Sequence, residues 1–303
     1  MLYLFLAIIC SSTIAFIFKF AENQKMNQYI ITSSNYFIAS TISLFMIANN
    51  NLLKGLVKEQ SLFNEWKILL SQTEYMLSPY NSVIWGTSVG GISGLFFFYS
   101  FLYYQKSVKE NGVGLSGTFS KLGILIPMVF SIVIWEEFPT SIQWFGIILS
   151  LISIVMVNLS FESIKKFDFN KTILLLFIFG GIAEFSNKIY QKYAISDYKD
   201  VFLFAVFLVA FLISFFYTKK DQTKWKVRDV LTGFAVGVPN LFSSYFLILS
   251  LDTLSASVAF PIFSAGSIVL INIGGFFIFK ETISAKNKLA IGLIIIGLVL
   301  INI

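Results

Sequence analysis

Residues 111–158 read NGVGLSGTFSKLGILIPMVFSIVIWEEFPTSIQWFGIILSLISIVMVN, and residues 255–302 read SASVAFPIFSAGSIVLINIGGFFIFKETISAKNKLAIGLIIIGLVLIN. The second stretch aligns with the first without a gap when Glu281 is placed on Glu137. Each copy holds a long apolar segment, an acidic turn and a second apolar segment. A self-similar stretch of this length indicates duplication of a structural unit.

Composition places the chain in a membrane. Of its 303 residues, 56% are hydrophobic and 13% are charged, and the mean hydropathy is +0.80. A soluble protein of this size carries about 25% charged residues, so too little polar surface is left to cover a water-soluble globule. The net charge of +6 is explained by lysine-rich loops between membrane helices.

Ten apolar runs have about the length that a membrane-spanning helix needs, so we predict an all-α membrane protein with ten transmembrane helices. The first run lacks a basic leader and a small-residue cleavage site, which favours a retained helix. The ten predicted helices are Leu2–Phe18, Tyr29–Ala48, Ser82–Tyr104, Gly112–Trp135, Ile142–Leu159, Thr172–Asn187, Val201–Tyr217, Val230–Leu251, Ser255–Phe279 and Asn287–Ile303.

The repeat extends upstream, because residues 10–19 align with residues 179–188. We therefore predict two five-helix halves, residues 1–160 and 171–303. Five is an odd number, so the second half enters the membrane from the opposite side and the repeat is inverted in space. Inverted repeats are typical of secondary transporters, which bind substrate near the bilayer midplane between the halves.

The long connection 49–81 contains apolar residues at roughly helical spacing with lysines between them. This pattern predicts a helix that lies in the membrane interface, with a loop packed on a soluble partner as the alternative. Loops after odd-numbered helices carry fourteen basic residues and the other loops carry five. By the positive-inside rule, this difference places both termini outside the cytoplasm.

Four ionisable residues lie within or at the end of apolar segments: Lys19, Lys121, Glu184 and Lys188. Charges at such depth usually face a cavity or a partner. Glu184 and Lys188 have the spacing of an intrahelical ion pair, which either neutralises both or opens toward substrate. Lys19 and Lys188 are close enough to helix ends to reach the interface with their ammonium groups.

Lys121 is the exception inside the repeat, because Ala265 occupies the equivalent position. It lies about 15 to 20 Å from either end of its predicted helix at 1.5 Å per residue. We expect Lys121 to line the central cavity, with a buried pair to Glu184 as the alternative.

Other polar groups in the apolar segments are candidates for the same site. A tyrosine hydroxyl needs a partner when buried, and Tyr99 and Tyr103 share one helical face. The amides of Asn187 and Asn240 are also candidates, and Asn240, like Asn35, either joins helices or contacts substrate. Glycines stripe several segments, which predicts close helix packing. Pro127, Pro239 and Pro261 predict kinks.

The composition argues against the common enzyme classes. The chain has no histidine, a single cysteine, no GxxxxGK[ST] phosphate loop and no ligand set for zinc. We therefore expect no catalytic residues, metal or cofactor, and transport driven by a gradient.

The segments SKLGILIPMVFSIVIWEE and GIILSLISIVMVNL, with GVPNLFSSYFLILSL and SASVAFPIFSAGSIVLINIGGFFIFKET as a second copy, resemble the EamA family of the drug/metabolite transporter superfamily. The resemblance implies ten helices in two inverted halves and transport of amino acids, other metabolites or drugs, often outward. It also implies cytoplasmic termini, against the lysine count. Where the family usually has glycine before the turn glutamate, this chain has Glu136 and Lys280.

We therefore predict a secondary transporter of a small polar or amphipathic metabolite in the cell (inner or plasma) membrane. Its expected partners are the substrate, the lipid bilayer and a coupling ion, H⁺ or Na⁺, with no nucleic acid. A lipid-carrier or sugar-phosphate translocator is the second transport hypothesis. A membrane scaffold or accessory subunit without flux is the third.

Overall fold

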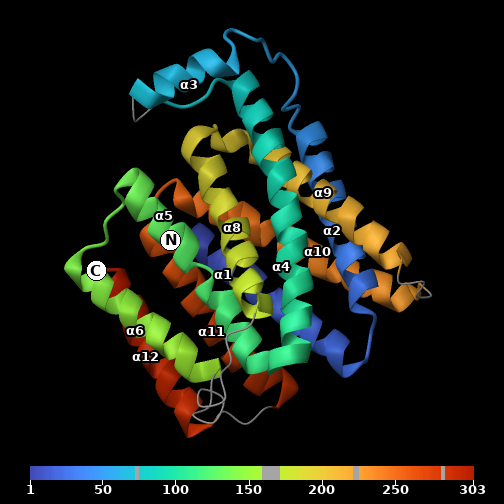
Figure 1. The fold of residues 1–303 in the computed structure, drawn as a ribbon, viewed down its shortest axis with the longest axis vertical. Coiled ribbons are helices and arrows are strands. Elements are labelled where there is room, and N and C mark those ends of the chain that lie inside the picture. Colours follow the sequence, from blue (N-terminus) through green and yellow to red (C-terminus); the bar gives the residue numbers. More distant parts are fainter. Residues whose placement is uncertain (72–74, 159–170, 221–224, 281–283) are drawn as a thin grey trace. The chain divides into compact units, whose positions relative to one another are not determined.

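The computed structural model describes residues 1–71, 75–158, 171–220, 225–280 and 284–303, which are helical with short connections (Figure 1). A 3-10 turn, η1, covers Ser196–Tyr198. The helices are α1 (Leu2–Asn23), α2 (Gln28–Asn49), α3 (Leu62–Ser71), α4 (Pro79–Leu122), α5 (Leu125–Trp135), α6 (Ser141–Asn158), α8 (Lys171–Tyr193), α9 (Lys199–Lys220), α10 (Val227–Leu251), α11 (Ala256–Phe279) and α12 (Ala285–Ile301).

Eight helical segments in the described residues are long and apolar enough to cross a membrane. The fifth predicted span corresponds to a shorter apolar helix, Ser141–Val157, and the tenth to the 17-residue α12. The all-α membrane fold is confirmed, and the count of ten spans remains a prediction.

The boundary between the third and fourth predicted helices differs from the prediction. We predicted separate helices Ser82–Tyr104 and Gly112–Trp135, whereas α4 is continuous from Pro79 to Leu122 and α5 begins at Leu125. The charged run 106–110 suggested a loop, but lysine and glutamate are good helix formers, so a helix continues through them. The candidate spans on either side of this run are Pro79–Val108 and Leu115–Trp135.

The chain forms two compact units, and each takes helices from both predicted halves. Unit 1 comprises residues 1–16, 99–185 and 253–303, and unit 2 comprises residues 17–98 and 186–252. The helices α1, α4 and α8 contribute residues to both units.

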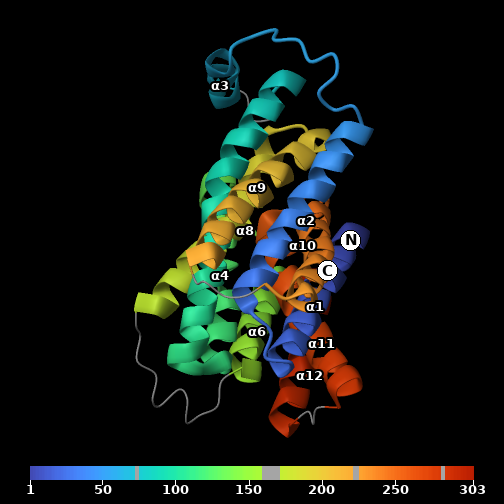
Figure 2. The same ribbon diagram turned by 90° about the vertical axis from the view of Figure 1, so that its right-hand side faces the viewer.

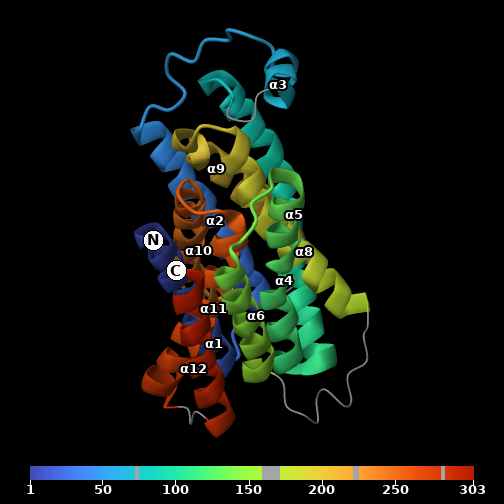
Figure 3. The ribbon, with the colours of Figure 1, turned by 90° about the vertical axis from the view of Figure 1, so that its left-hand side faces the viewer.

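Unit 1 contains the antiparallel pair α6 and α12, which lie side by side (Figures 1 and 3). Gln143 Nε2 donates to the Ile301 carbonyl at 3.2 Å, and a Cβ at Gly146 would lie 2.7 Å from the Gly297 carbonyl oxygen. In the alignment of the two copies, Ser150 corresponds to Ile294. Gly146 precedes Ser150 and Gly297 follows Ile294 by nearly the same number of residues, so the two helices cross close to this corresponding pair. Corresponding helices that cross antiparallel at corresponding residues are what an inverted repeat requires.

Unit 2 contains a second such pair, α2 and α9, together with α10 (Figure 2). The Thr218 hydroxyl of α9 donates to the Tyr29 carbonyl of α2 at 3.2 Å, and the Tyr36 and Phe207 rings stack 6.2 Å apart. These contacts make α2 and α9, the second helices of the two predicted halves, antiparallel. The inverted arrangement therefore recurs in both units.

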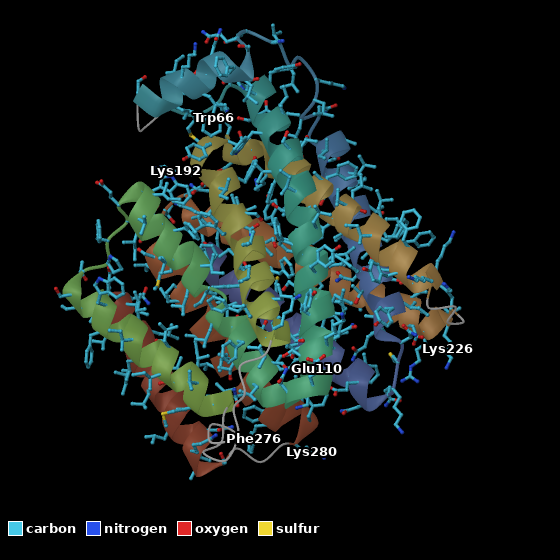
Figure 4. All side chains as sticks on the ribbon, viewed as in Figure 1. Trp66, Glu110, Lys192, Lys226, Phe276 and Lys280 are labelled. Atoms are coloured by element: carbon cyan, nitrogen blue, oxygen red, sulfur yellow. The ribbon has the colours of Figure 1, made fainter. Side chains whose placement is uncertain are left out.

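The predicted helix in the long connection exists as α3, and part of it packs on unit 2. Trp66 lies 4.9 Å from Trp85 and 5.2 Å from Tyr193 between ring centroids (Figure 4). Glu65 is 1% exposed and accepts a hydrogen bond from the Ser78 backbone N–H at 2.9 Å. Phe63 is 69% exposed, so α3 presents an apolar side chain outward, and its position in the membrane interface stays a prediction.

The two residues that replace the family's glycine have the backbone conformation that favours glycine. Glu136 ends α5 with φ 56° and ψ 30°, and Lys280 ends α11 with φ 54° and ψ 35°. Both lie in the left-handed region, where a side chain costs about 1 kcal/mol or more. The two positions correspond in the repeat, so both halves end this helix in the same way.

We expect Glu136→Gly and Lys280→Gly each to stabilise the protein by about 1 kcal/mol, because glycine adopts this conformation without strain. Thermal unfolding of the purified protein in detergent measures the effect. Glu110→Gly is the matched control, since Glu110 is exposed within helix α4 and glycine there should lower stability by about 1 kcal/mol (Figure 4). Equal changes at all three positions would contradict the explanation.

Candidate functional site

A helix break in unit 1 follows immediately after Lys121. Helix α4 ends at Leu122, Gly123 and Ile124 form a turn, and α5 starts at Leu125. Pro127 has no N–H to donate to the Gly123 carbonyl, which instead accepts from the Ile126 N–H at 3.0 Å. The disturbance predicted at Pro127 is therefore a break between α4 and α5 that lies before the proline.

The break packs against α8 through two glycines. A Cβ added to Gly181 would overlap Ile126 Cδ1 and lie 2.5 Å from the Gly123 carbonyl oxygen. A Cβ added to Gly123 would lie 3.1 Å from the Gly181 backbone nitrogen. The two backbones therefore touch, and this contact fixes α8 beside the end of α4.

Because Glu184 is one helical turn beyond Gly181, the same contact brings its carboxylate into range of Lys121. Both side chains are partly buried, and Glu184 is the acidic group whose charge acts on the Lys121 ammonium. The Ser264 hydroxyl of α11 donates to the Lys121 carbonyl at 3.3 Å. The freed carbonyl at the helix break is therefore satisfied by protein, as the interior of a membrane requires.

Tyr99 and Tyr103 also belong to unit 1 and pack on α8. Their ring centroids lie 5.5 Å and 5.4 Å from that of Phe179. The shared helical face predicted for the two tyrosines is thus confirmed, and it lies against the helix that carries Glu184. Four predicted site residues, Tyr99, Tyr103, Lys121 and Glu184, occur in this unit.

The other four predicted site residues, Lys19, Asn187, Lys188 and Asn240, belong to unit 2. Lys188 is 3% exposed, and its Nζ donates to Gln191 Oε1 at 3.2 Å. Gln191 Nε2 in turn donates to Asp252 Oδ1 at 3.0 Å. The helix predicted to end at Asn187 continues to Tyr193, so Lys188 lies within α8 and is buried.

Asn240 joins two helices of unit 2. Its Nδ2 donates to Asn35 Oδ1 at 3.1 Å, and Asn35 is 4% exposed. One helical turn before Asn240, a Cβ at Gly237 would lie 2.5 Å from the Asn35 carbonyl oxygen, so α10 and α2 touch through their backbones. Of the two alternatives for these amides, the observed bond is the one between helices.

We expect the Asn35–Asn240 bond to show a coupling of about 1 kcal/mol in a double-mutant cycle. The cycle compares Asn35→Ala, Asn240→Ala and the double variant by thermal unfolding in detergent. Additive effects of the two single substitutions would show that the bond contributes nothing.

Residues 171–303 match the EamA-like transporter family. The sequence resemblance is thereby confirmed, and the match supports a membrane transporter of small molecules as the class of protein.

Relatives of this chain include an uncharacterized protein of Haemophilus influenzae, 23% identical over 291 residues, which are 95% of this chain and 93% of that protein. In Bacillus subtilis, the uncharacterized membrane protein YvaE is 38% identical over 78 residues, 23% of this chain and 66% of YvaE. The multidrug resistance protein EbrB of Bacillus subtilis is 36% identical over 78 residues, 26% of this chain and 62% of EbrB.

A solved crystal structure superposes on this chain with a TM-score of 0.70, and the likeness covers 99% of this chain and 94% of that one. The identity of 16% means that this likeness shows the fold alone. The likeness to that structure extends over both predicted halves, including the part before residue 171.

Sequence reasoning missed the residues that position Lys121. Gly123 is one of 19 glycines, so it does not stand out by type, and Gly181 indicates only close packing near Glu184 without showing which segment it touches. Ser264 could have been noticed, because it occupies the repeat position of Ser120, next to Lys121. The contact of Glu137 was also missed: its Oε2 accepts a hydrogen bond from the Ala256 N–H at 2.6 Å and so caps α11.

Proposed function

We propose that this EamA-like protein is a secondary active transporter of a small polar or amphipathic metabolite, located in the cell membrane. The observation that carries the proposal is the break after Lys121, which leaves a charged side chain and a helix end inside an apolar segment. Discontinuous helices of this kind form substrate and ion sites in secondary transporters. Intramembrane charges usually mark a functional path.

The chemistry of the break favours a substrate that carries a carboxylate or a similar anionic group. The Lys121 ammonium supplies the positive charge, and Glu184 beside it suits a substrate amine. Tyr99 and Tyr103 add aromatic surface on the same helix α4. Together these groups fit an amino-acid-like or drug-like molecule, and EbrB, a multidrug resistance protein, supports the second class.

The mechanism that we propose is alternating access, in which the site opens to one side of the membrane at a time. The helix break lets α4 and α5 move as separate segments. The Gly123–Gly181 contact keeps the break packed against α8 during this movement. Export is the proposed direction.

A thermal-shift screen of the purified protein tests the proposal. Amino acids, organic anions, sugar phosphates and lipophilic cations are added at millimolar concentration. A ligand at 100 times its Kd stabilises the folded state by about 2.7 kcal/mol, so a substrate raises the melting temperature. The same solute should then enter liposomes that contain the protein.

Stabilisation by sugar phosphates alone would instead support a sugar-phosphate translocator. A screen in which no solute stabilises the protein, with no flux in liposomes, would support a scaffold and refute the proposal.

A further inference from the structure

A buried aspartate stands at the start of α9 in unit 2, outside the site already described. Asp200 is the second residue of this helix and is 2% exposed. Its carboxylate has one hydrogen-bond partner in the Asn50 side chain. Within the described residues, Asp200 Oδ1 is fully buried and accepts no hydrogen bond.

The nearest cation does not neutralise this carboxylate through a hydrogen bond. Lys199 Nζ donates to the Ser196 carbonyl at 3.2 Å and lies 4.5 Å from the centre of the Tyr245 ring. Lys199 therefore acts on Asp200 through its charge alone. An ionised carboxylate oxygen without a donor costs several kcal/mol in such surroundings.

Three carboxylates of this region act on one phenol. Asp197 of η1, Asp200 of α9 and Asp252 after α10 act together on the Tyr190 phenol of α8. The Tyr190 hydroxyl donates to the Ile195 carbonyl at 2.9 Å, so it is not directed at Asp200.

Asp252 differs from Asp200 in its hydrogen bonds. Its Oδ1 accepts from Gln191 Nε2 at 3.0 Å and from the Ser196 hydroxyl at 2.8 Å. Asp252 is also exposed, so donors and solvent both satisfy its carboxylate. Of these two aspartates, Asp200 is the one with a buried carboxylate oxygen that accepts no hydrogen bond.

A proton satisfies this need without any further ligand. A bound metal cation takes several oxygen ligands, about six for Ca²⁺ or Mg²⁺. No group of three acidic, histidine or cysteine side chains that could hold a metal occurs in the part of the chain that the structure describes. A single proton on Oδ1 forms an O–H bond and removes the buried charge.

We propose that Asp200 is a proton-binding site and that the proton it takes from water and returns to water is the coupling ion of transport. The second part rests on the proposed function, and the first part does not. Asp200 lies near the start of the candidate span Ser196–Lys220, so its proton has a short path to the aqueous phase. Asp200 also belongs to the same unit as Lys188 of α8.

Infrared difference spectroscopy of the protein in liposomes, between about pH 5 and about pH 8, tests the proton site. The wild type should show the carbonyl stretch of a protonated carboxylic acid in an apolar setting, and Asp200→Asn should lose this band. Asp200→Ser is a second variant in case the first does not fold. Asp229→Asn is the control, because Asp229 is 3% exposed in the first turn of α10 but has no such fully buried oxygen without a partner. An unchanged band in a folded Asp200 variant would overturn the proposal.

Coupling is tested with the solute that the thermal-shift screen identifies. Asp200→Asn should reduce accumulation driven by a pH gradient by at least roughly tenfold, while exchange of labelled for unlabelled solute at equal pH stays within about twofold. Gradient-driven accumulation at the wild-type rate would refute coupling, and so would loss of exchange. A wild type without any flux would refute the proposed function and leave the infrared result to decide the proton site.

Discussion

Gly181→Ala should reduce the yield of folded protein severely, whereas Gly180→Ala should leave it nearly unchanged. The added methyl group at position 181 would overlap Ile126 Cδ1 and lie 2.5 Å from the Gly123 carbonyl oxygen, and a backbone atom cannot move aside cheaply. At position 180 the nearest atom is Ser100 Oγ at 3.3 Å, the end of a small side chain that can rotate. We expect a loss of about 3 kcal/mol or more for the first substitution and under about 1 kcal/mol for the second.

Size-exclusion chromatography and thermal unfolding in detergent measure both variants. The neighbouring glycines share the helix, the composition change and the loss of backbone flexibility, so they differ only in what the methyl group meets. Equal stability of the two variants would mean that the Gly123–Gly181 contact does not hold α8 at the helix break.

Removing one member of the Lys121–Glu184 pair should destabilise the protein more than removing both. A single substitution, Lys121→Met or Glu184→Gln, removes one of two opposite charges that act on each other in partly buried positions, at a cost of about 2 kcal/mol. The double variant removes both of these charges together and should unfold within about 1 kcal/mol of the wild type. Thermal unfolding of all four proteins gives the coupling.

Strictly additive losses would show that the two charges do not stabilise each other. Salt distinguishes this pair from a surface pair, since screening at about 0.5 M acts weakly on charges that are shielded from solvent. The coupling should therefore persist in high salt.

Much of the fold was predictable because it follows from repetition and apolar length. The aligned acidic turns at Glu137 and Glu281 indicated duplication, and an odd number of helices per half required inversion. The antiparallel crossing of α6 and α12 near Ser150 and Ile294 agrees with that logic. The inverted arrangement can be predicted from the repeat and from the lengths of the apolar runs, without knowledge of any contact between helices.

The parts that could not be predicted depend on contacts between distant segments. Nothing near Gly123 in sequence shows that Gly181 touches it, and a proline at position 127 predicts a disturbed helix without fixing where it breaks. The burial of Asp200 was equally hidden, since its neighbour Lys199 and the polar turn before it suggest an exposed loop. Which of the eight predicted site residues contact substrate remains a prediction.

The claim that Lys121 and Glu184 bind the transported solute is tested most directly by the double variant Lys121→Met, Glu184→Gln in liposomes. This variant lacks both charges yet is expected to fold, so lost transport cannot be attributed to unfolding. We predict that its uptake of the solute identified by thermal shift falls at least roughly tenfold below that of the wild type, the equivalent of about 1.4 kcal/mol. Uptake at the wild-type rate by the folded double variant would contradict the claim.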